Sequence, residues 1–245
     1  MEEKRTLFVV SDIHGHYTQL KAALDAAGFD ENRQDHVLLC CGDLFDRGGE
    51  NVTVYHYIRR LPRKILVRGN HDERLATVLR TGRVERYDER NGGLMTLREF
   101  FGPGCVSADG RLRIDHRLLE SAWQLLQLEG QMVDYYETEH YVFTHGWLPL
   151  EADGNVSRIR PDWRDAEPEA WHAARYAEWQ LLYHTPAKLP DKTIVCGHRT
   201  SRYGHFFDPE RAAEDYGIFH GNGVIAIDAC TALSGQVNVL VLAGE

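Results

Sequence analysis

The sequence predicts an α/β fold, and three observations support this prediction. Short runs of β-branched and apolar residues recur along the 245-residue chain, each bounded by Gly, Asp, His or Pro, as is typical of buried strands. Helical patterns separate the first three of these runs, which is the order of β-α-β units. Residues of a few polar types, mainly Asp, His and Asn, follow five of the runs.

Strands are expected at seven places: residues 6–11, 36–41, 64–68, 141–144, 193–196, 224–228 and 237–242. A helix is predicted over 17–29, because Leu20 and Leu24 share one face and Gly28 suits the end of a helix. A second helical pattern, over 51–61, precedes the third strand. Strands and helices therefore alternate at about 30 residues per unit, as in a sheet with helices on its faces.

Two segments interrupt this alternation. The first, about residues 75–140, is rich in Arg and Glu and contains a helical pattern over 115–130. The second, about 160–185, contains a helical pattern over 167–184. We expect two helical inserts on a single domain spanning 1–245. The arginines of the first insert favour a solvated surface over a groove for a nucleotide or phosphopeptide. The aromatic residues of the second favour core packing over base stacking, and both alternatives stay open.

Composition limits the classes of function. The chain is 43% apolar and 27% charged, which is typical of a globular protein. Its net charge of −9 argues against broad binding to nucleic acid or anionic membranes, although a bound metal could still attract a phosphorylated substrate. No apolar run is long enough to span a membrane, and no signal-peptide pattern is found at the start. Five cysteines, with Cys40 next to Cys41, indicate reduced thiols in a cytoplasmic protein.

Candidate polar residues for a site follow five of the expected strands. In chain order they are Asp12 and His14; Asp43, Asp46 and Arg47; Asn70, His71 and Asp72; His145; and His198. In open α/β sheets, binding sites form outside the carboxyl ends of the strands. We therefore expect these side chains to meet at one rim of the sheet.

These residue types suit two metal ions. Asp12 and His14 lie two residues apart in extended chain, so both can reach one ion, and the single carboxylate of Asp43 can bridge two ions. Neutral ligands come from three further positions: Asn70, His145 and His198. A mixed set of carboxylate, imidazole and amide favours Mn, Fe or Zn over calcium. Two such ions can hold a phosphoryl group and activate a water molecule near neutral pH.

Each candidate also has a structural explanation. Asp12 or Asp43 could cap a helix after a strand, and Asn70 could be a turn residue. These explanations are good for single residues. Together they would require five strand ends to acquire ligand-type residues independently, so the sequence favours a shared site.

The sequence resembles the calcineurin-like metallophosphoesterases. The motifs "SDIHG" (11–15), "GDLFDRGG" (42–49), "GNHD" (69–72), "FTHG" (143–146) and "CGH" (196–198) occur in the order and spacing of that superfamily. The branch that fits best holds the Ser/Thr phosphoprotein phosphatases and the symmetrical diadenosine tetraphosphatases. The resemblance implies a four-layer α/β/β/α sandwich with two central sheets, here with two helical inserts.

The resemblance also implies roles for individual residues. The first ion would be bound by Asp12, His14 and Asp43, and the second by Asp43, Asn70, His145 and His198. His71 would protonate the leaving oxygen and would be oriented by Asp46. Arg47 would contact the phosphoryl oxygens, with Arg175 as the candidate for a second phosphate-binding arginine and Arg164 behind it. The sequence "GHRT" (197–200) lacks the second histidine of the Gly-His-x-His motif, and His205 is a possible extra ligand or substrate contact.

The sequence thus predicts a cytoplasmic phosphatase with two metal ions, Mn first and Fe or Zn as alternatives. It would hydrolyse phosphomonoesters, in the manner of a Ser/Thr phosphoprotein phosphatase, by attack of a hydroxide bridging the two ions. One alternative is a symmetrical bis(5'-nucleosyl)-tetraphosphatase or another nucleotide phosphohydrolase. Another is a metal-binding scaffold without catalysis, against which the retention of His71 argues.

Overall fold

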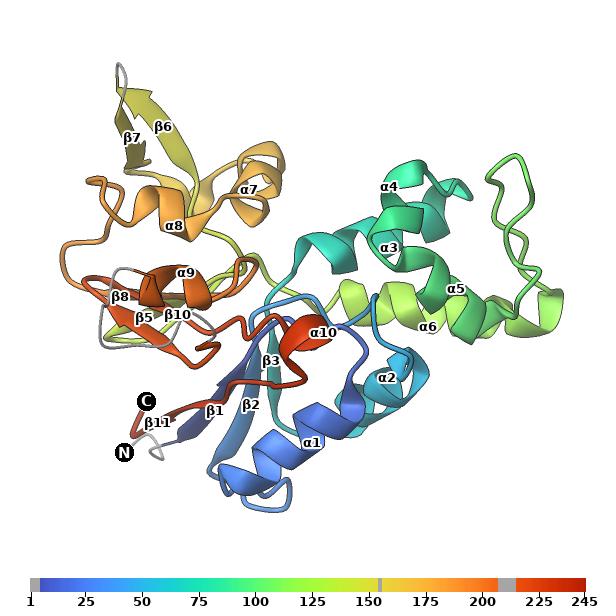
Figure 1. Ribbon diagram of the computed structural model, residues 1–245, viewed down its shortest axis with the longest axis horizontal. Coiled ribbons are helices and arrows are strands. Elements are labelled where there is room, and N and C mark those ends of the chain that lie inside the picture. The colour runs from blue at the N-terminus through green and yellow to red at the C-terminus, as the bar shows by residue number, and fades with distance from the viewer. Residues whose placement is uncertain (1–4, 154–155, 207–214) are drawn as a thin grey trace.

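A computed structural model describes residues 5–153, 156–206 and 215–245. Its first sheet has four strands in the order β11-β1-β2-β3. Strands β1 (Thr6–Val10), β2 (His36–Cys40) and β3 (Lys64–Leu66) are parallel, and β11 (Leu240–Ala243) joins β1 antiparallel at the edge. The carboxyl ends of β1, β2 and β3 therefore lie at the same edge of this sheet (Figure 1).

The second sheet has five strands in the order β4-β5-β8-β10-β9. Its three central strands, β5 (Tyr141–Phe143), β8 (Thr193–Cys196) and β10 (Val224–Ala226), are parallel. The edge strands β4 (Tyr136–Glu137) and β9 (Phe219–Gly221) run antiparallel to their neighbours.

Helices cover the outer face of each sheet. Helices α1 (Tyr17–Ala26) and α2 (Asn51–Arg60) lie against the first sheet, and α7 (Pro168–Arg175) and α8 (Trp179–Leu182) lie on the side of the second (Figure 1). The short elements are the hairpin β6 (Leu150–Asp153) and β7 (Val156–Ile159), the 3-10 turn η2 (Trp163–Asp165), and helices α9 (Arg202–His205) and α10 (Thr231–Ser234). None of the helices among the described residues has the length and apolar character needed to cross a membrane.

The alternation of side chains along β1 explains the layers. Leu7 and Val9 point into a buried cluster shared with Phe143 and Val195 of the second sheet. Phe8 instead joins the cluster under α1 and α2. The two sheets therefore pack face to face with helices outside both, and the predicted four-layer sandwich is confirmed.

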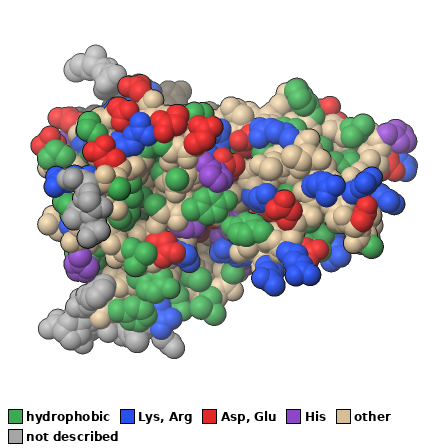
Figure 2. All heavy atoms as spheres, turned by 90° about the horizontal axis from the view of Figure 1, so that it is seen from above, with side chains coloured by type: hydrophobic (Ala, Val, Ile, Leu, Met, Phe, Trp, Pro, Cys, Tyr) green, Lys and Arg blue, Asp and Glu red, His purple; other side chains and the backbone are tan. Residues whose placement is uncertain are grey.

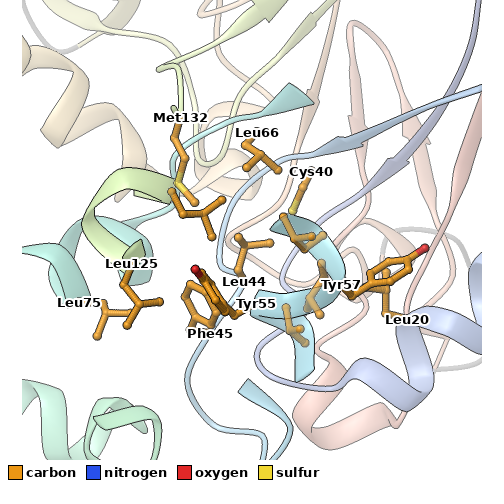
Figure 3. Close-up of a cluster of buried hydrophobic side chains, with 14 of the residues drawn as sticks. Leu20, Cys40, Leu44, Phe45, Tyr55, Tyr57, Leu66, Leu75, Leu125 and Met132 are labelled. Carbon is orange, nitrogen blue, oxygen red and sulfur yellow. The ribbon is translucent and has the colours of Figure 1, made fainter. Parts of the chain in front are cut away.

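The first insert is helical, as predicted, but its first helix begins earlier than residue 75. It comprises α3 (Asn70–Thr81), α4 (Arg86–Arg90), α5 (Gly93–Phe101), the 3-10 turn η1 (His116–Leu118) and α6 (Leu119–Glu129). Phe45, which follows β2, packs in the same buried cluster as Leu75 of α3 and Leu125 of α6 (Figure 3). The same cluster includes residues of α1 and α2, so the insert shares its core with the helical layer of the first sheet.

The observed elements differ from the predicted ones in the start of the last strand, in four additional strands and in a break within one helix. The last strand begins at residue 240 rather than 237, and strands β4, β6, β7 and β9 were not predicted. The helix expected over 167–184 is two helices separated at 176–178. The break has a local cause, because the carbonyl of Ala174 accepts hydrogen bonds from the backbone N–H groups of Trp147 and Ala177 rather than continuing a helical ladder.

Candidate dimetal site

The predicted ligands meet at the carboxyl ends of the strands. They are carried by the turns after β1, β2, β5 and β8 and by the first turn of α3. All are buried except His198, which is partly exposed. Figure 2 shows histidine spheres in the middle of the face seen from above, beside the half of the molecule where Lys and Arg side chains predominate.

Asp43 lies at the centre of the group. Its Oδ2 is 3.6 Å from His14 Nε2, and its Oδ1 is 3.4 Å from His145 Nε2. Two sets of side chains could each hold an ion, with ligand atoms within 4.8 Å of one another: His14, Asp43 and His71, and Asp43, His145 and His198. Asp43 belongs to both sets, as a bridging carboxylate would.

Asn70 joins the second set through its amide oxygen. Asn70 Oδ1 lies 2.8 Å from His145 Nε2 and 3.0 Å from His198 Nδ1. An amide oxygen and two imidazole nitrogens therefore converge on one point. The helix α3 fixes this geometry, because Asn70 is its first residue and Gly69 before it has extended backbone.

Asp12 faces the first set. Its Oδ1 is 3.8 Å from His14 Nε2, while its Oδ2 accepts hydrogen bonds from Ser11 Oγ and from the backbone N–H of His198. His14 Nε2 is buried and has no hydrogen-bond partner among the described residues. A buried nitrogen without a partner, facing two carboxylates, fits a metal ligand better than a core histidine.

Backbone carbonyls orient two of the imidazole rings. His14 Nδ1 is 2.8 Å from the carbonyl oxygen of Phe45, and His145 Nδ1 is 2.7 Å from that of Cys41. These contacts place the N–H on Nδ1 and leave the lone pair on Nε2 free for an ion.

The backbone is strained where these residues lie. Seven non-glycine residues among those described have positive φ, and six of them are predicted site residues: Asp12, His14, Asp43, Asp46, Arg47 and His198. The left-handed conformation is unfavourable for residues with a side chain and persists only where the surroundings fix it. Strain concentrated in this way is typical of functional sites.

Burial sets the charge state of the group. It lowers the pKa of His14 well below its usual value and the pKa of His198 to about 2, so both rings are neutral and able to bind a metal. It raises the pKa of both Asp12 and Asp43, and a neighbouring carboxylate raises each further, Asp43 acting on Asp12 and Asp46 acting on Asp43. Asp12 and Asp43 lie beside neutral imidazoles and form no ion pair with a described Lys or Arg, so the site is a favourable place for metal ions.

His71 differs from the other histidines. Its Nδ1 lies 2.7 Å from Asp46 Oδ2, and its Nε2 lies 3.1 Å from the guanidinium Nη2 of Arg47. Burial alone would lower the pKa of His71, but the charge of Asp43 and the hydrogen bond and charge of Asp46 outweigh it and raise the pKa to about 8. The His71 ring is therefore mostly protonated at neutral pH, unlike its neighbours.

The remaining candidates are paired with groups outside the ligand set. Arg175 is buried, and its guanidinium pairs with Glu73 at 2.6 Å and Asp134 at 3.0 Å. Arg164 pairs with Glu137 and covers the ring of Trp163. His205 is buried, with its Nε2 3.0 Å from the carbonyl oxygen of Gly217.

Sequence reasoning gave no role to several residues that surround the site. Asp72 accepts hydrogen bonds from the backbone N–H groups of Asp43, Leu44 and Gly69, and burial raises its pKa to about 6. Asp228 is buried beside Asp12, and burial raises its pKa well above the usual value. Asp72 ends the motif "GNHD" (69–72), and Asp228 ends the strand expected over 224–228, so the sequence marked both positions without giving them a role.

Two tyrosines at the rim were also missed as site residues. The hydroxyl of Tyr87, on α4, is 3.4 Å from Asn70 Nδ2, and this tyrosine is 39% exposed. The ring of Tyr176, after α7, lies 6.3 Å from that of His198. One comes from each insert, and no local sequence pattern connects them with the ligands.

A four-layer sandwich with carboxylates and histidines at the strand ends defines a class of metal-dependent hydrolases, and comparison with known proteins agrees. The sequence model of the Calcineurin-like phosphoesterase family matches residues 5–228. The chain belongs to this family.

Two of the relatives similar to this chain are named as bis(5'-nucleosyl)-tetraphosphatases. The chain is 27% identical over 206 residues to a bis(5'-nucleosyl)-tetraphosphatase PrpE [asymmetrical] from Bacillus velezensis, an alignment that covers 74% of this chain and 78% of the relative. It is 41% identical over 70 residues to a bis(5'-nucleosyl)-tetraphosphatase, symmetrical, from Aeromonas salmonicida, but this match covers only 28% of this chain and 25% of the relative.

Solved structures show the same fold. A provisionally assigned diadenosine tetraphosphatase has a TM-score of 0.53 at 16% identity, covering 100% of this chain and 96% of that one. The cold-active protein-tyrosine phosphatase of a psychrophilic Shewanella species has a TM-score of 0.54 at 17% identity, covering 98% and 76%. At these identities the likeness concerns the fold alone.

Proposed function

We propose that this phosphoesterase cleaves phosphate monoesters at a two-ion centre. The observation that carries the proposal is the position of Asp43, whose two carboxylate oxygens face different histidines, His14 and His145. A carboxylate placed in this way suits the bridge between two ions.

The side chains fit such a centre. One ion would be held by Asp12, His14 and Asp43, and the other by Asp43, Asn70, His145 and His198. The partnerless Nε2 of His14 supports this assignment, because an ion would satisfy it. Mn is proposed first, with Fe or Zn as alternatives, because the set mixes oxygen and nitrogen donors. When bound, the ions would polarise the phosphoryl oxygens and lower the pKa of a water molecule.

His71 would donate a proton to the leaving oxygen. Its Nδ1 is occupied by the Asp46 carboxylate, so its Nε2 is the nitrogen left to face the substrate. A pKa of about 8 keeps this ring charged at neutral pH and able to act as an acid. The alternative, that His71 binds an ion with His14 and Asp43, follows from their proximity and is tested below.

Arg47 would bind the phosphoryl oxygens. Its side chain is exposed, and its guanidinium lies 3.1 Å from His71 Nε2, so it reaches the point where a leaving group would be protonated. A planar guanidinium can bind two phosphoryl oxygens at once. Arg175 remains a candidate for a second contact, but it would first have to release Glu73 or Asp134.

The rim tyrosines favour a second candidate function, the hydrolysis of a dinucleoside polyphosphate. Tyr87 and Tyr176 offer aromatic surface beside Asn70 and His198, and nucleobases stack well on such surfaces. The names of the Bacillus and Aeromonas relatives support the same substrate class. A phosphoprotein substrate would use the same ions without needing these rings.

The first experiment removes metal with a chelator and adds back Mn, Fe(II) or Zn. We expect p-nitrophenyl phosphate hydrolysis to be lost on chelation and restored best by Mn. Hydrolysis that survives complete metal removal, measured by elemental analysis, would disprove the two-ion mechanism.

The second experiment compares diadenosine tetraphosphate with a phosphoserine peptide. If nucleotides are the substrates, Tyr87→Leu should lower kcat/KM for the dinucleotide about tenfold, because stacking on one aromatic ring is worth about 1–3 kcal/mol, and it should spare the peptide. Tyr136→Leu, on the edge strand β4, is the matched control. Equal losses on both substrates would instead favour the phosphomonoesterase proposal.

A further inference from the structure

One face of α5 packs on the turn that carries Asp46 and Arg47. The contacts come from Gly92, Thr96 and Glu99, which are spaced by four and three residues and therefore share one side of the helix. At Gly92, even a Cβ would lie 2.3 Å from the backbone nitrogen of Arg47, so the two backbones are in direct contact. The insert therefore touches the candidate catalytic turn itself.

The hydroxyl of Thr96 holds the Asp46 carboxylate. It donates to Asp46 Oδ1 at 2.6 Å and accepts from the backbone N–H of Asp46 at 3.0 Å. The other oxygen, Oδ2, is the one that contacts His71. Thr96 is fully buried, so water does not compete for these bonds. One carboxylate oxygen is thus assigned to the imidazole and the other to the insert.

Glu99 secures the same turn one helical turn later. Its Oε2 accepts hydrogen bonds from the backbone N–H and side-chain Nδ2 of Asn51, at 2.9 and 2.8 Å. Asn51 Oδ1 in turn accepts from the backbone N–H of Asp46 at 2.9 Å. The backbone N–H of Asp46 therefore lies between two acceptors, Asn51 and Thr96, and both depend on α5.

The contacts from α5 stabilise an unfavourable backbone conformation at Asp46 and Arg47. Asp46 and Arg47 are consecutive non-glycine residues with φ of 77° and 65°. Two adjacent residues in the left-handed region cost on the order of 1–3 kcal/mol each unless the surroundings fix them. Hydrogen bonds from α5 supply that constraint on one side, and the buried Phe45 supplies it on the other.

We infer that Thr96 is a positioning residue for proton transfer: through Asp46 it fixes the orientation in which His71 presents Nε2 to the leaving group. Helix α5 of the first insert would then contribute to catalysis by positioning Asp46 and His71. This inference rests on the proposed role of His71 as proton donor.

The inference predicts a dependence on the leaving group. Losing the Thr96 hydroxyl frees the Asp46 carboxylate to rotate and releases the His71 ring from one orientation. A poor leaving group, such as the phenolate of phenyl phosphate, needs the proton, whereas p-nitrophenolate leaves without it. Substrate binding and the metal ligands are not involved, so KM and metal content should stay unchanged.

The test compares Thr96→Val with Thr96→Ser, which restores the hydroxyl. Thr77→Val is the matched control, because the Thr77 hydroxyl donates to the backbone carbonyl of Glu73 in its own helix and has no other partner among the described residues. For Thr96→Val we expect kcat on phenyl phosphate to fall about tenfold and kcat on p-nitrophenyl phosphate to fall less than about threefold. Thr96→Ser and Thr77→Val should behave as the unchanged protein. Equal losses on both substrates, or no rescue by serine, would overturn the inference.

A second readout needs no turnover. The proton shared by His71 Nδ1 and Asp46 should give a downfield NMR signal in the metal-free protein, assigned by its loss in His71→Asn. We expect Thr96→Val to shift or broaden this signal and Thr96→Ser to retain it; an unchanged signal would overturn the inference. Absence of turnover in the unchanged protein would instead contradict the proposed function. If Thr96→Val does not fold, Thr96→Ala replaces it under the same criteria.

Discussion

The candidate site and the surface of the first insert contain the same residue types in opposite surroundings. At the site, Asp43 and His14 are buried, and Asp43 forms no ion pair with a described Lys or Arg. On the insert, Asp115 is exposed and pairs with Arg117, two residues away. Burial raises the pKa of Asp43, whereas the Arg117 side chain lowers that of Asp115. Asp43 is thus buried with His71 nearby but without an ion-paired Lys or Arg among the described residues, which leaves its oxygens able to bind a metal ion.

The backbone makes the same distinction. In the described part of the chain, positive φ within residues 75–140 occurs only at glycines, where it costs little. At the site it occurs at Asp, His and Arg residues. Conformational strain therefore separates the two regions as clearly as burial does.

The largest expected effect is at Asp43. Asp43→Asn should lower turnover of p-nitrophenyl phosphate more than about 100-fold and reduce bound Mn, since changes to groups that merely orient ligands already cost about 10- to 100-fold. Asp115→Asn, the matched exposed carboxylate, should leave both unchanged. Normal turnover and metal content in Asp43→Asn would show that buried Asp43 is no more a metal ligand than exposed Asp115.

His71 should come next. His71→Asn should lower kcat about 10²- to 10⁴-fold while bound Mn stays near normal, because the ring is proposed to transfer a proton and not to bind an ion. His116→Asn, an exposed histidine beside Asp115, is the control. Loss of metal in His71→Asn would place His71 among the ligands, with His14 and Asp43.

The sequence was informative wherever function depends on the end of a strand. Asp12, Asp43 and His145 each follow a short apolar run, so periodicity located them and the parallel sheets brought them together. Asn70 was read as following a strand, and it does, but it also opens α3, so the insert and the ligand set share a helix.

The sequence could not predict contacts between segments that no motif or hydrophobic periodicity connects. Thr96 meets Asp46 across 50 residues, and Tyr87 meets Asn70 from a different helix. Threonine in an amphipathic helix and tyrosine on its surface are ordinary residues, so nothing local distinguishes them. The short edge strands β4 and β9 were missed for a related reason, because two or three residues are too few to establish a period of two.

A smaller effect is expected in the pH dependence of His71, which should differ from that of an exposed histidine. His71 must be protonated to act as an acid, and its pKa is raised from 6.5 to about 8. We therefore expect the His71 imidazole of the metal-free protein to lose its proton at about pH 8, as followed by NMR. An exposed histidine would titrate at about pH 6.5 instead. His71→Asn should remove this transition, and its persistence would assign it to another group.

The smallest effect is expected at Arg175, which joins α7 of the second insert to α3 through Glu73. Arg175 is buried but paired with Glu73 and Asp134, which are themselves partly exposed. Removing one member of a buried pair costs about 3–5 kcal/mol, and exposed pairs are worth about 0–1 kcal/mol, so Arg175→Gln should lower the free energy of unfolding by about 2 kcal/mol. Arg117→Gln, on the exposed face, should leave the unfolding midpoint unchanged.

Turnover then separates the two roles considered for Arg175. If it only ties α3 to the second insert through Glu73, the folded Arg175→Gln protein should keep KM for p-nitrophenyl phosphate, because no contact with the substrate has been lost. If it releases Glu73 to bind the phosphoryl group, KM should rise or kcat fall several-fold, as expected for a lost charge-assisted contact.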